Sequence, residues 1–119
     1  MKVEEYRTIL AKGMSEDSFQ DEVIRLAKIH GWKYYHTHDS RRSVAGFPDL
    51  VLVHPSRGVL WRELKKWNGR VSKEQQEWLD RLADAGEDAG VWRPMDWLDG
   101  TIEKELRGWP RERCPCRRE

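Results

Sequence analysis

Two carboxylates and a lysine stand at the ends of two apolar segments, at a spacing that suits a single site. Asp49 follows Gly46-Phe47-Pro48 and opens the first segment, while Glu63 and Lys65 close the second. If the two segments are neighbouring strands, the three side chains meet at one edge of a sheet. Side chains alternate along a strand, so Glu63 and Lys65 share a face. Such a group suits a hard divalent cation and a phosphodiester.

Three oxygen donors in this group could hold a metal ion. The carboxylates of Asp49 and Glu63 and the backbone carbonyl of Leu64 would supply three ligands to Mg²⁺, which prefers oxygen and keeps several waters. Lys65 would hold or deprotonate the attacking water and offset the charge that develops on the phosphate. The alternative is strand-end surface charge, with Glu63 and Lys65 forming an ion pair of small energetic value.

The surrounding sequence predicts the elements that must position this group. Ser15 caps a helix in which Phe19 and Val23 recur at helical spacing, and Gly31 ends it. Residues 1–14 form a short leading helix or stay loose. Strands are predicted at 32–37, 51–53, 59–65 and 89–92, and helices at 15–30, from Ser72 to Gly86 and from Asp96 to about Leu106. The order αβββαβα predicts an α/β fold with a mixed central sheet flanked by helices.

With these motifs in place, the chain resembles the VRR-NUC domain of the PD-(D/E)xK nuclease superfamily. The resemblance rests on Gly46-Phe47-Pro48-Asp49, Glu63-Leu64-Lys65 and Gln75, and it runs from about residue 15 to residue 94. It implies a restriction-endonuclease-like fold and cleavage of DNA that depends on Mg²⁺ or Mn²⁺, with no organic cofactor. Stand-alone members of bacterial and phage type are similar to Holliday-junction resolvases and can work as homodimers. A branched DNA substrate and a homodimer are therefore expected.

The resemblance also implies a catalytic carboxylate on the first helix. The family has an acidic residue in a segment like E-x-x-(I/F)-Q, which matches residues 16–20 here. Glu16 precedes Phe19 and Val23 by three and seven positions, so it is expected on their inward face. Glu22 is the rival. The alternative for Glu16 is a charge that meets the helix macrodipole.

Two roles are possible for Gln75, one in the chemistry and one in capping its helix. Gln75 resembles the family's helix glutamine, which positions water or phosphate near the lysine. It also lies three residues after Ser72, which is the spacing of a capping box, and that explains it equally well. The same helix is expected to bury one stripe of residues, Trp78, Leu79, Leu82 and Ala83.

Basic residues on both sides of the acidic pair are candidates for DNA binding. The candidates are His38, Arg41, Arg42, Ser43, Lys66, Arg70 and Lys73. Arginine and lysine can make charge-assisted bonds to phosphate. Plain solvated surface is the alternative for each cluster, and His36 with His38 could bind zinc, although no third ligand is evident.

Composition sets wider limits on the protein. The 119 residues suffice for one domain, and 22 Lys and Arg against 21 Asp and Glu leave a net charge of +1. Overall charge therefore gives no argument for a polyanionic partner. The sequence has neither an apolar segment of membrane-spanning length nor an N-terminal signal, so a cytoplasmic protein is expected.

We expect an extension at 1–14, the nuclease-like domain at 15–108 and a basic tail at 109–119, in which Cys114 and Cys116 are reduced thiols.

Two questions stay open at the level of sequence. Seven tryptophans are many for this length, and Trp92, Trp97 and Trp109 are candidates for a dimer interface, with a small monomer core as the alternative. The function is expected to be structure-directed DNA cleavage. A catalytically idle DNA-binding or assembly module and a sequence-specific restriction-type nuclease are the other readings of the same residues.

Overall fold

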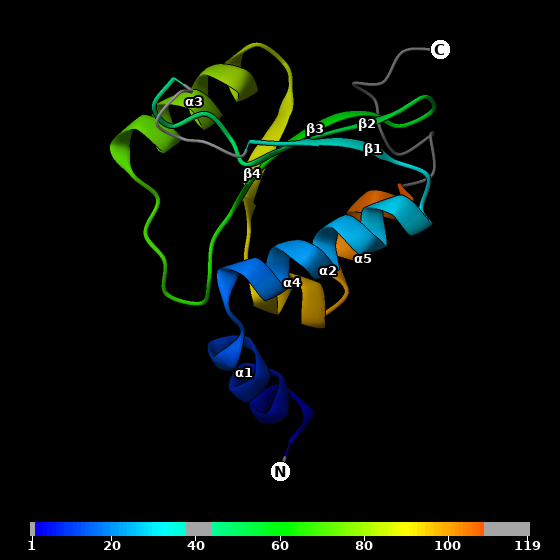
Figure 1. Ribbon diagram of the computed structural model, residues 1–119, viewed down its shortest axis with the longest axis vertical. Helices are drawn as coiled ribbons and strands as arrows, with labels where there is room; N and C mark the ends of the chain where they lie inside the picture. Colours follow the sequence, from blue (N-terminus) through cyan, green and yellow to red (C-terminus); the bar gives the residue numbers. More distant parts are fainter. Residues whose placement is uncertain (1, 38–43, 109–119) are drawn as a thin grey trace.

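A four-stranded mixed sheet forms the centre of the protein. The computed structural model describes residues 2–37 and 44–108 (Figure 1). The strands are β1 (Lys33–His36), β2 (Leu50–His54), β3 (Gly58–Leu64) and β4 (Asp88–Trp92), in the spatial order β1-β2-β3-β4. β1, β2 and β3 pair antiparallel, and β4 adds to β3 in parallel. The predicted mixed sheet is confirmed.

Helices lie on both sides of this sheet. They are α1 (Val3–Gly13), α2 (Glu16–Ile29), α3 (Lys73–Asp84), α4 (Pro94–Leu98) and α5 (Thr101–Arg107). In Figure 1, α2, α4 and α5 lie on one side of the sheet and α3 lies on the other, near β4. α3 serves as the crossover between the parallel strands β3 and β4, as a parallel pair requires. The expected α/β architecture with flanking helices is therefore present.

The main core lies between the sheet and the helices α2 and α5. The helical spacing predicted for 15–30 is confirmed, because Phe19, Val23 and Ala27 of α2 are all fully buried. They pack on alternate residues of the sheet and on α5, namely Leu50, Leu52, Leu60, Leu64, Trp92, Ile102 and Leu106. Side chains between these residues along β2 and β3 point to the opposite face, which is where Asp49 and Glu63 lie.

The prediction of a single C-terminal helix is wrong. Instead of one helix from Asp96 to Leu106, α4 ends at Leu98 and α5 begins at Thr101. Gly100 between them has φ of 87°, a left-handed conformation that interrupts the helix and that glycine adopts without strain. Asp96 does not precede α4 but lies in its first turn, where its carboxylate accepts a bond from the backbone N–H of Arg93.

The predicted buried stripe of α3 also needs correction. Leu79 is buried, and Trp78 and Leu82 are half-buried, but Ala83 is exposed. α3 covers only part of the sheet, beside β4, so the apolar stripe along it is narrower than the sequence suggested. Trp78 packs edge-on against Phe47, with 5.0 Å between ring centroids, and Phe47 packs in turn against Trp61 of β3.

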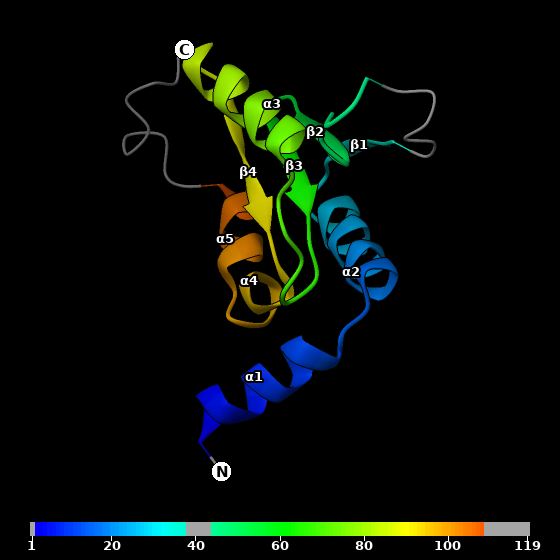
Figure 2. The ribbon, with the colours of Figure 1, turned by 90° about the vertical axis from the view of Figure 1, so that its left-hand side faces the viewer.

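The first residues form a helix, which settles the choice left open by the sequence. α1 projects from the body of the protein and reaches it near α4, as Figure 2 shows in side view. Ala11 is fully buried, whereas Val3, Tyr6 and Ile9 are exposed. Within the described residues no helix is long and apolar enough to cross a membrane.

Candidate active site

The two carboxylates meet because of the register between β2 and β3. Leu50 pairs with Arg62, so Asp49 stands opposite Glu63 one position beyond the end of that ladder. Asp49 Oδ2 accepts a hydrogen bond of 2.9 Å from the backbone N–H of Leu64. Lys65 Nζ lies 3.5 Å from Glu63 Oε2, which shows that Glu63 and Lys65 share a face of the strand. The structure therefore brings together the three residues that the sequence singled out.

Glu63 is the most unusual charge of this group because its side chain is almost fully buried. Only 2% of the residue is exposed. Its Oε2 atom accepts a hydrogen bond of 2.8 Å from Gln75 Nε2 and pairs with Lys65, but its Oε1 atom is buried with no hydrogen-bond partner. Burial, followed by the neighbouring Asp49 carboxylate, raises the pKa of Glu63 to about 8, against the lowering effect of Lys65.

Gln75 forms the capping box that was one of its two predicted roles, and it also bonds to the buried carboxylate of Glu63. A role in positioning water or phosphate stays a prediction. The Oε1 atom of Gln75 accepts from the backbone N–H of Ser72 while Ser72 Oγ accepts from the backbone N–H of Gln75, which completes a capping box at the start of α3. The remaining polar atom, Nε2, donates to Glu63. The cap therefore fixes the direction in which Gln75 presents its donor to the buried carboxylate.

Gly46 holds the start of α3 against the loop that precedes Asp49. Its φ is 87°, and a Cβ atom there would lie 2.4 Å from the backbone carbon of Glu74 and 2.8 Å from the backbone nitrogen of Gln75. Any larger residue would push the first turn of α3 away from the loop. The motif Gly46-Phe47-Pro48-Asp49 thus sets two positions at once, that of Asp49 and that of Gln75.

The donors present fit a hard divalent cation. The unpartnered Oε1 atom of buried Glu63 is the observation that requires a partner, since an unsatisfied buried carboxylate oxygen is costly. Leu64 directs its N–H to Asp49, whereas the N–H of Lys65 goes to the carbonyl of Trp92. The N–H and C=O of one extended residue point to the same side, so the Leu64 carbonyl faces the side of Asp49.

The protein ligands alone would not complete a coordination shell. Within the described residues, no group of three or more His, Cys, Asp or Glu side chains is placed to hold a metal ion. Two carboxylates and a backbone carbonyl leave positions for water and substrate, as Mg²⁺ sites commonly do. The same finding gives no support to a zinc site at His36, whose expected companion His38 lies outside the described residues.

The predicted inward position of Glu16 is wrong. Glu16 is exposed although Phe19 and Val23 are buried. It is the first residue of α2, so the packed face begins one turn after it. The rival Glu22 is occupied on the surface by an ion pair with Arg25. A catalytic role for Glu16 remains a prediction.

The basic candidates described by the structure surround one end of the site. Lys66, Arg70 and Lys73 are all exposed, on the turn after β3 and at the start of α3. Arg93, which the sequence did not suggest, stabilises this turn by donating to the carbonyls of Lys66 and Gly69 at 3.0 and 2.8 Å. Several predicted residues lie outside the described part of the chain, namely His38, Arg41, Arg42, Ser43, Trp109, Cys114 and Cys116.

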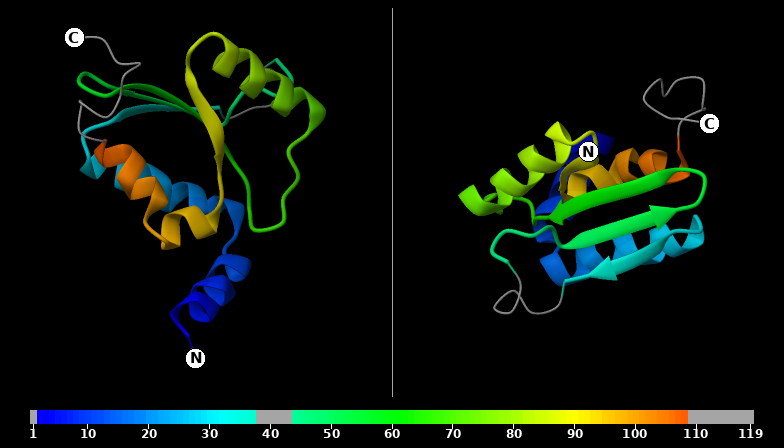
Figure 3. Two further views of the ribbon diagram at one scale, coloured as in Figure 1. Left: turned by 180° about the vertical axis from the view of Figure 1, so that it is seen from behind. Right: turned by 90° about the horizontal axis from the view of Figure 1, so that it is seen from above.

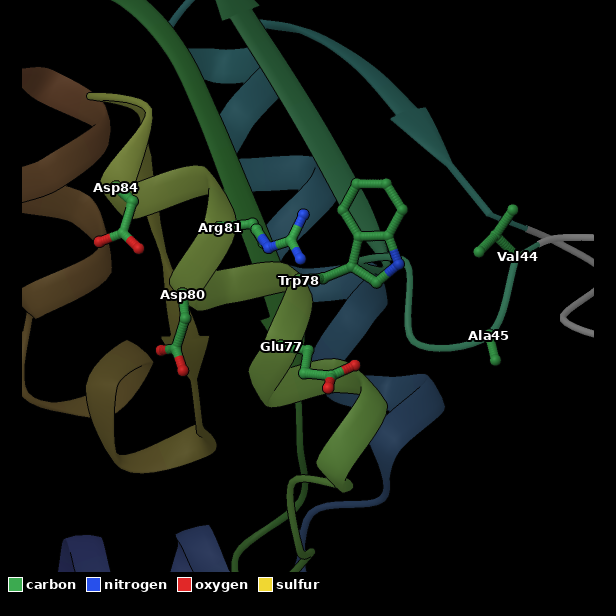
Figure 4. A pocket seen from close by; sticks show the side chains of 7 residues that line it. All are labelled: Val44, Ala45, Glu77, Trp78, Asp80, Arg81 and Asp84. Carbon is green, nitrogen blue, oxygen red and sulfur yellow. The ribbon is translucent and has the colours of Figure 1, made fainter.

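The outer side of α3 is acidic, unlike the basic end of the site. A hollow of about 460 Å³ lies between Val44 and α3, and Figure 4 shows Trp78 extending across it toward Val44. Three carboxylates, of Glu77, Asp80 and Asp84, also line it, together with one arginine, Arg81. These carboxylates would repel phosphate, so DNA is expected to approach from the basic end of α3 instead.

Trp92 is a core residue, which excludes it from the proposed dimer interface. It is 2% exposed, its Nε1 donates to Glu105, and the guanidinium of Arg62 lies 4.9 Å from its ring centroid. The alternative of a tryptophan that completes the monomer core is therefore correct for Trp92. Trp97 is half-buried and packs against the same core.

A mixed sheet with flanking helices carries the buried Glu63, the half-buried Asp49 and Lys65 at one end. This arrangement defines an α/β fold of the restriction-endonuclease-like kind. Comparison with known proteins agrees with this class. The family model of the VRR-NUC domain matches residues 2–96. The chain therefore belongs to the VRR-NUC family, within the PD-(D/E)xK superfamily, which is a family of nucleases acting on DNA.

Two solved structures have a similar fold. One, described as a "VRR_NUC domain protein", is 25% identical with a TM-score of 0.64, and the match covers 81% of this chain and 91% of that one. A second, described as a "VRR_NUC domain", is 23% identical with a TM-score of 0.62 over 74% of this chain and 94% of that one. No curated protein matches the sequence significantly.

Proposed function

We propose that this protein is a divalent-metal-dependent endonuclease that hydrolyses DNA phosphodiester bonds. The observation that carries the proposal is the buried Glu63, which has one oxygen held by Lys65 and Gln75 and the other oxygen without a partner beside Asp49. A protein gains no stability from such an arrangement in the absence of a bound cation. The arrangement is therefore explained better by chemistry than by folding.

Each residue of the group has a proposed role. Asp49, Glu63 and the Leu64 carbonyl would hold Mg²⁺ or Mn²⁺, and the ion, when bound, would polarise the phosphate and acidify a water. Gln75 keeps the Glu63 carboxylate in one orientation through its hydrogen bond to Oε2. Lys65 would hold or deprotonate the attacking water and offset the negative charge that develops on the phosphate oxygens.

The DNA backbone would be held by the basic residues around this group. Lys66, Arg70 and Lys73 are exposed next to Lys65 and the start of α3, where phosphate contacts would place the strand across the site. His38, Arg41, Arg42 and Ser43 are proposed to contribute from the segment before Val44. Their contacts would be independent of sequence, since phosphate is the same at every nucleotide.

We propose further that the substrate is recognised by its structure, as branched DNA or a Holliday junction. The helices and strands of the described residues all belong to one sheet and its flanking helices, which supports shape rather than sequence as the signal. Two cuts on opposing strands would need two sites, and a homodimer supplies them by twofold symmetry. Trp97 and Trp109 remain candidates for its interface. The cytoplasm is the proposed location.

A cleavage panel tests the proposed activity. The protein is incubated with linear duplex, single-stranded, flap and four-way-junction DNA in Mg²⁺, Mn²⁺, Ca²⁺ or excess EDTA. We expect cleavage with Mg²⁺ or Mn²⁺, little with Ca²⁺ and none in EDTA. Asp49→Asn, Glu63→Gln and Lys65→Ala should each remove most cleavage and leave binding, whereas Glu77→Gln, an exposed carboxylate on α3, is the matched control.

The outcomes separate the three readings of the site. Cutting of the junction in preference to linear DNA supports structure-directed cleavage. Cutting of linear duplex at one sequence only would support the restriction-type alternative. Binding without any cleavage under all metal conditions would leave the idle module as the better account, and full activity of Lys65→Ala would refute the role of that lysine.

A further inference from the structure

The turn that follows Lys65 is attached to the end of β4 by backbone and side-chain hydrogen bonds. The backbone N–H of Lys65 donates to the carbonyl of Trp92 at 3.1 Å. Arg93 Nη1 donates to the carbonyl of Lys66 at 3.0 Å and to the carbonyl of Gly69 at 2.8 Å. The left-hand view of Figure 3 shows this segment, between β3 and α3, running down beside the end of β4. The turn can move away from β4 only by breaking two charge-assisted hydrogen bonds.

The backbone of Arg93 is itself held in place. Arg93 directly follows β4 and is the N-cap residue of α4, where its backbone N–H donates to Asp96 Oδ2 at 2.8 Å. The next residue, Pro94, is buried and has a restricted backbone. The side chain of Arg93 therefore extends from a rigid point, the junction of the sheet with α4, and holds the turn against that junction.

The turn lies alongside the side chain of Lys65. A Cβ atom at Gly69 would lie 3.4 Å from Lys65 Cδ and 3.5 Å from Lys65 Cβ, which is ordinary contact distance, so the backbone of Gly69 runs close to the lysine stem. Only 14% of the Lys65 side chain is exposed, and its Nζ lies 3.5 Å from Glu63 Oε2. A lysine side chain loses much rotamer entropy when it is fixed. Packing along the stem therefore helps to keep Nζ beside the carboxylate.

We propose that Arg93 is a positioning residue for cleavage, which places Lys65 by holding the turn at 66–69 against its stem. Arg93 acts through this turn and not by contact with DNA. The inference rests on the proposed function, in which Lys65 acts on the attacking water and the phosphate. A displacement of about 1 Å in a reacting group can slow a reaction about 100-fold, so loss of the turn's attachment should be visible in the rate.

A double-mutant cycle with Lys65 tests the proposal. Arg93→Met retains an unbranched side chain but has no donor for the two carbonyls. In Mg²⁺ it should lower kcat by up to about 100-fold and leave KM unchanged. It should have no further effect on the residual cleavage by Lys65→Ala, because residues that act as one unit are not additive. Arg93→Lys, whose ammonium can donate to both carbonyls, should restore part of kcat. Arg25→Met, which removes an exposed arginine of α2, is the matched control.

Acetylation of lysine amines measures the position of Lys65 without DNA. The protein is treated briefly with acetic anhydride, and its peptides are then quantified by mass spectrometry. Lys65 should react slowly in the wild type, because its side chain is mostly buried beside Glu63. Arg93→Met should raise its rate of reaction severalfold and leave exposed Lys33 unchanged. Urea unfolding identifies a variant that is not folded, in which case Arg93→Lys provides the comparison.

Three outcomes would overturn the inference. One is an equal loss of kcat from Arg93→Met in the wild type and in Lys65→Ala, since Arg93 would then act independently of the lysine. Another is a higher KM with an unchanged kcat, which would make Arg93 a DNA contact. The third is a lower urea midpoint for Arg93→Met with normal kcat, which would make the attachment of the turn a matter of stability only.

The proposed function and the inference can fail separately. A wild-type protein that cuts DNA, with an Arg93→Met variant that matches it in kcat and in the acetylation of Lys65, refutes the inference alone. A wild-type protein that cuts no DNA under any metal condition refutes the nuclease proposal. Faster acetylation of Lys65 in Arg93→Met would still support the positioning of the lysine by Arg93 in that case, and an unchanged rate would refute it.

Discussion

Replacement of Glu63 by glutamine should stabilise the metal-free protein while it destroys activity. The folded protein raises the pKa of Glu63 from its ordinary value of 4.5 to about 8, so between these two pH values the folded state holds a proton that the unfolded chain has released. The stability that this proton contributes is complete below pH 4.5 and is lost as the pH rises through 8. Glutamine does not ionise and carries no such penalty.

The magnitude follows from the width of this pH window. Each pH unit inside the window costs the wild-type protein about 1.4 kcal/mol relative to the glutamine variant, so from pH 5 to pH 7 the difference should grow by about 2–3 kcal/mol. Glutamine has nearly the same size and shape as glutamate. It can accept from Gln75 Nε2 as the carboxylate does, and its NH₂ group can donate to Asp49.

Urea unfolding in EDTA at pH 5, 6 and 7 measures the effect. The difference in unfolding free energy between Glu63→Gln and wild type should rise steadily with pH, because titrating groups that do not interact with Glu63 cancel in the comparison. Glu77→Gln, which alters an exposed carboxylate, should show a constant difference. Added Mg²⁺ should stabilise the wild type more than Glu63→Gln, since a ligand stabilises the state that binds it. A difference for Glu63→Gln that stays the same from pH 5 to pH 7 would refute the reasoning.

Three other changes test parts of the same structure. Gly46→Ala should lower the unfolding free energy by about 1–3 kcal/mol, because the added Cβ meets the backbone of α3 at a positive φ, and an unchanged urea midpoint would contradict the close approach. Arg62→Ala should cost about 1.5–3 kcal/mol, since it removes a buried guanidinium that pairs with the partly exposed carboxylates of Asp88 and Glu105, and calorimetry measures it. Arg41→Ala combined with Arg42→Ala should weaken binding to all DNA sequences alike and reduce the salt dependence by up to about two counterion units; an unchanged slope would leave both arginines as surface charge.

The sequence by itself determined the centre of the site. Asp49, Glu63 and Lys65 could be placed together because the two apolar segments are close in the chain, and their alternation leaves only one face for the charged residues. The first helix could be predicted for a similar reason, since its cap and its apolar spacing are both local signals. Such features depend on interactions between residues that are neighbours in the sequence.

Features that depend on distant segments needed the structure. The exposure of Glu16 could not be seen from helical spacing alone, because spacing gives the direction of a side chain and not the point where the neighbouring sheet ends. The same limit applied to Ala83, which has the right periodicity but no sheet opposite it, and to Trp92, whose burial depends on packing against Arg62 and α5.

Gln75 shows where the boundary lies between the two kinds of information. Its capping box with Ser72 spans three residues and is visible in the sequence, but its hydrogen bond to Glu63 crosses twelve residues and requires α3 to pack closely on the loop at Gly46. Local spacing determines which groups a residue can offer. Tertiary packing decides which of them meet, because burial and the contact between remote segments arise only when the whole chain folds.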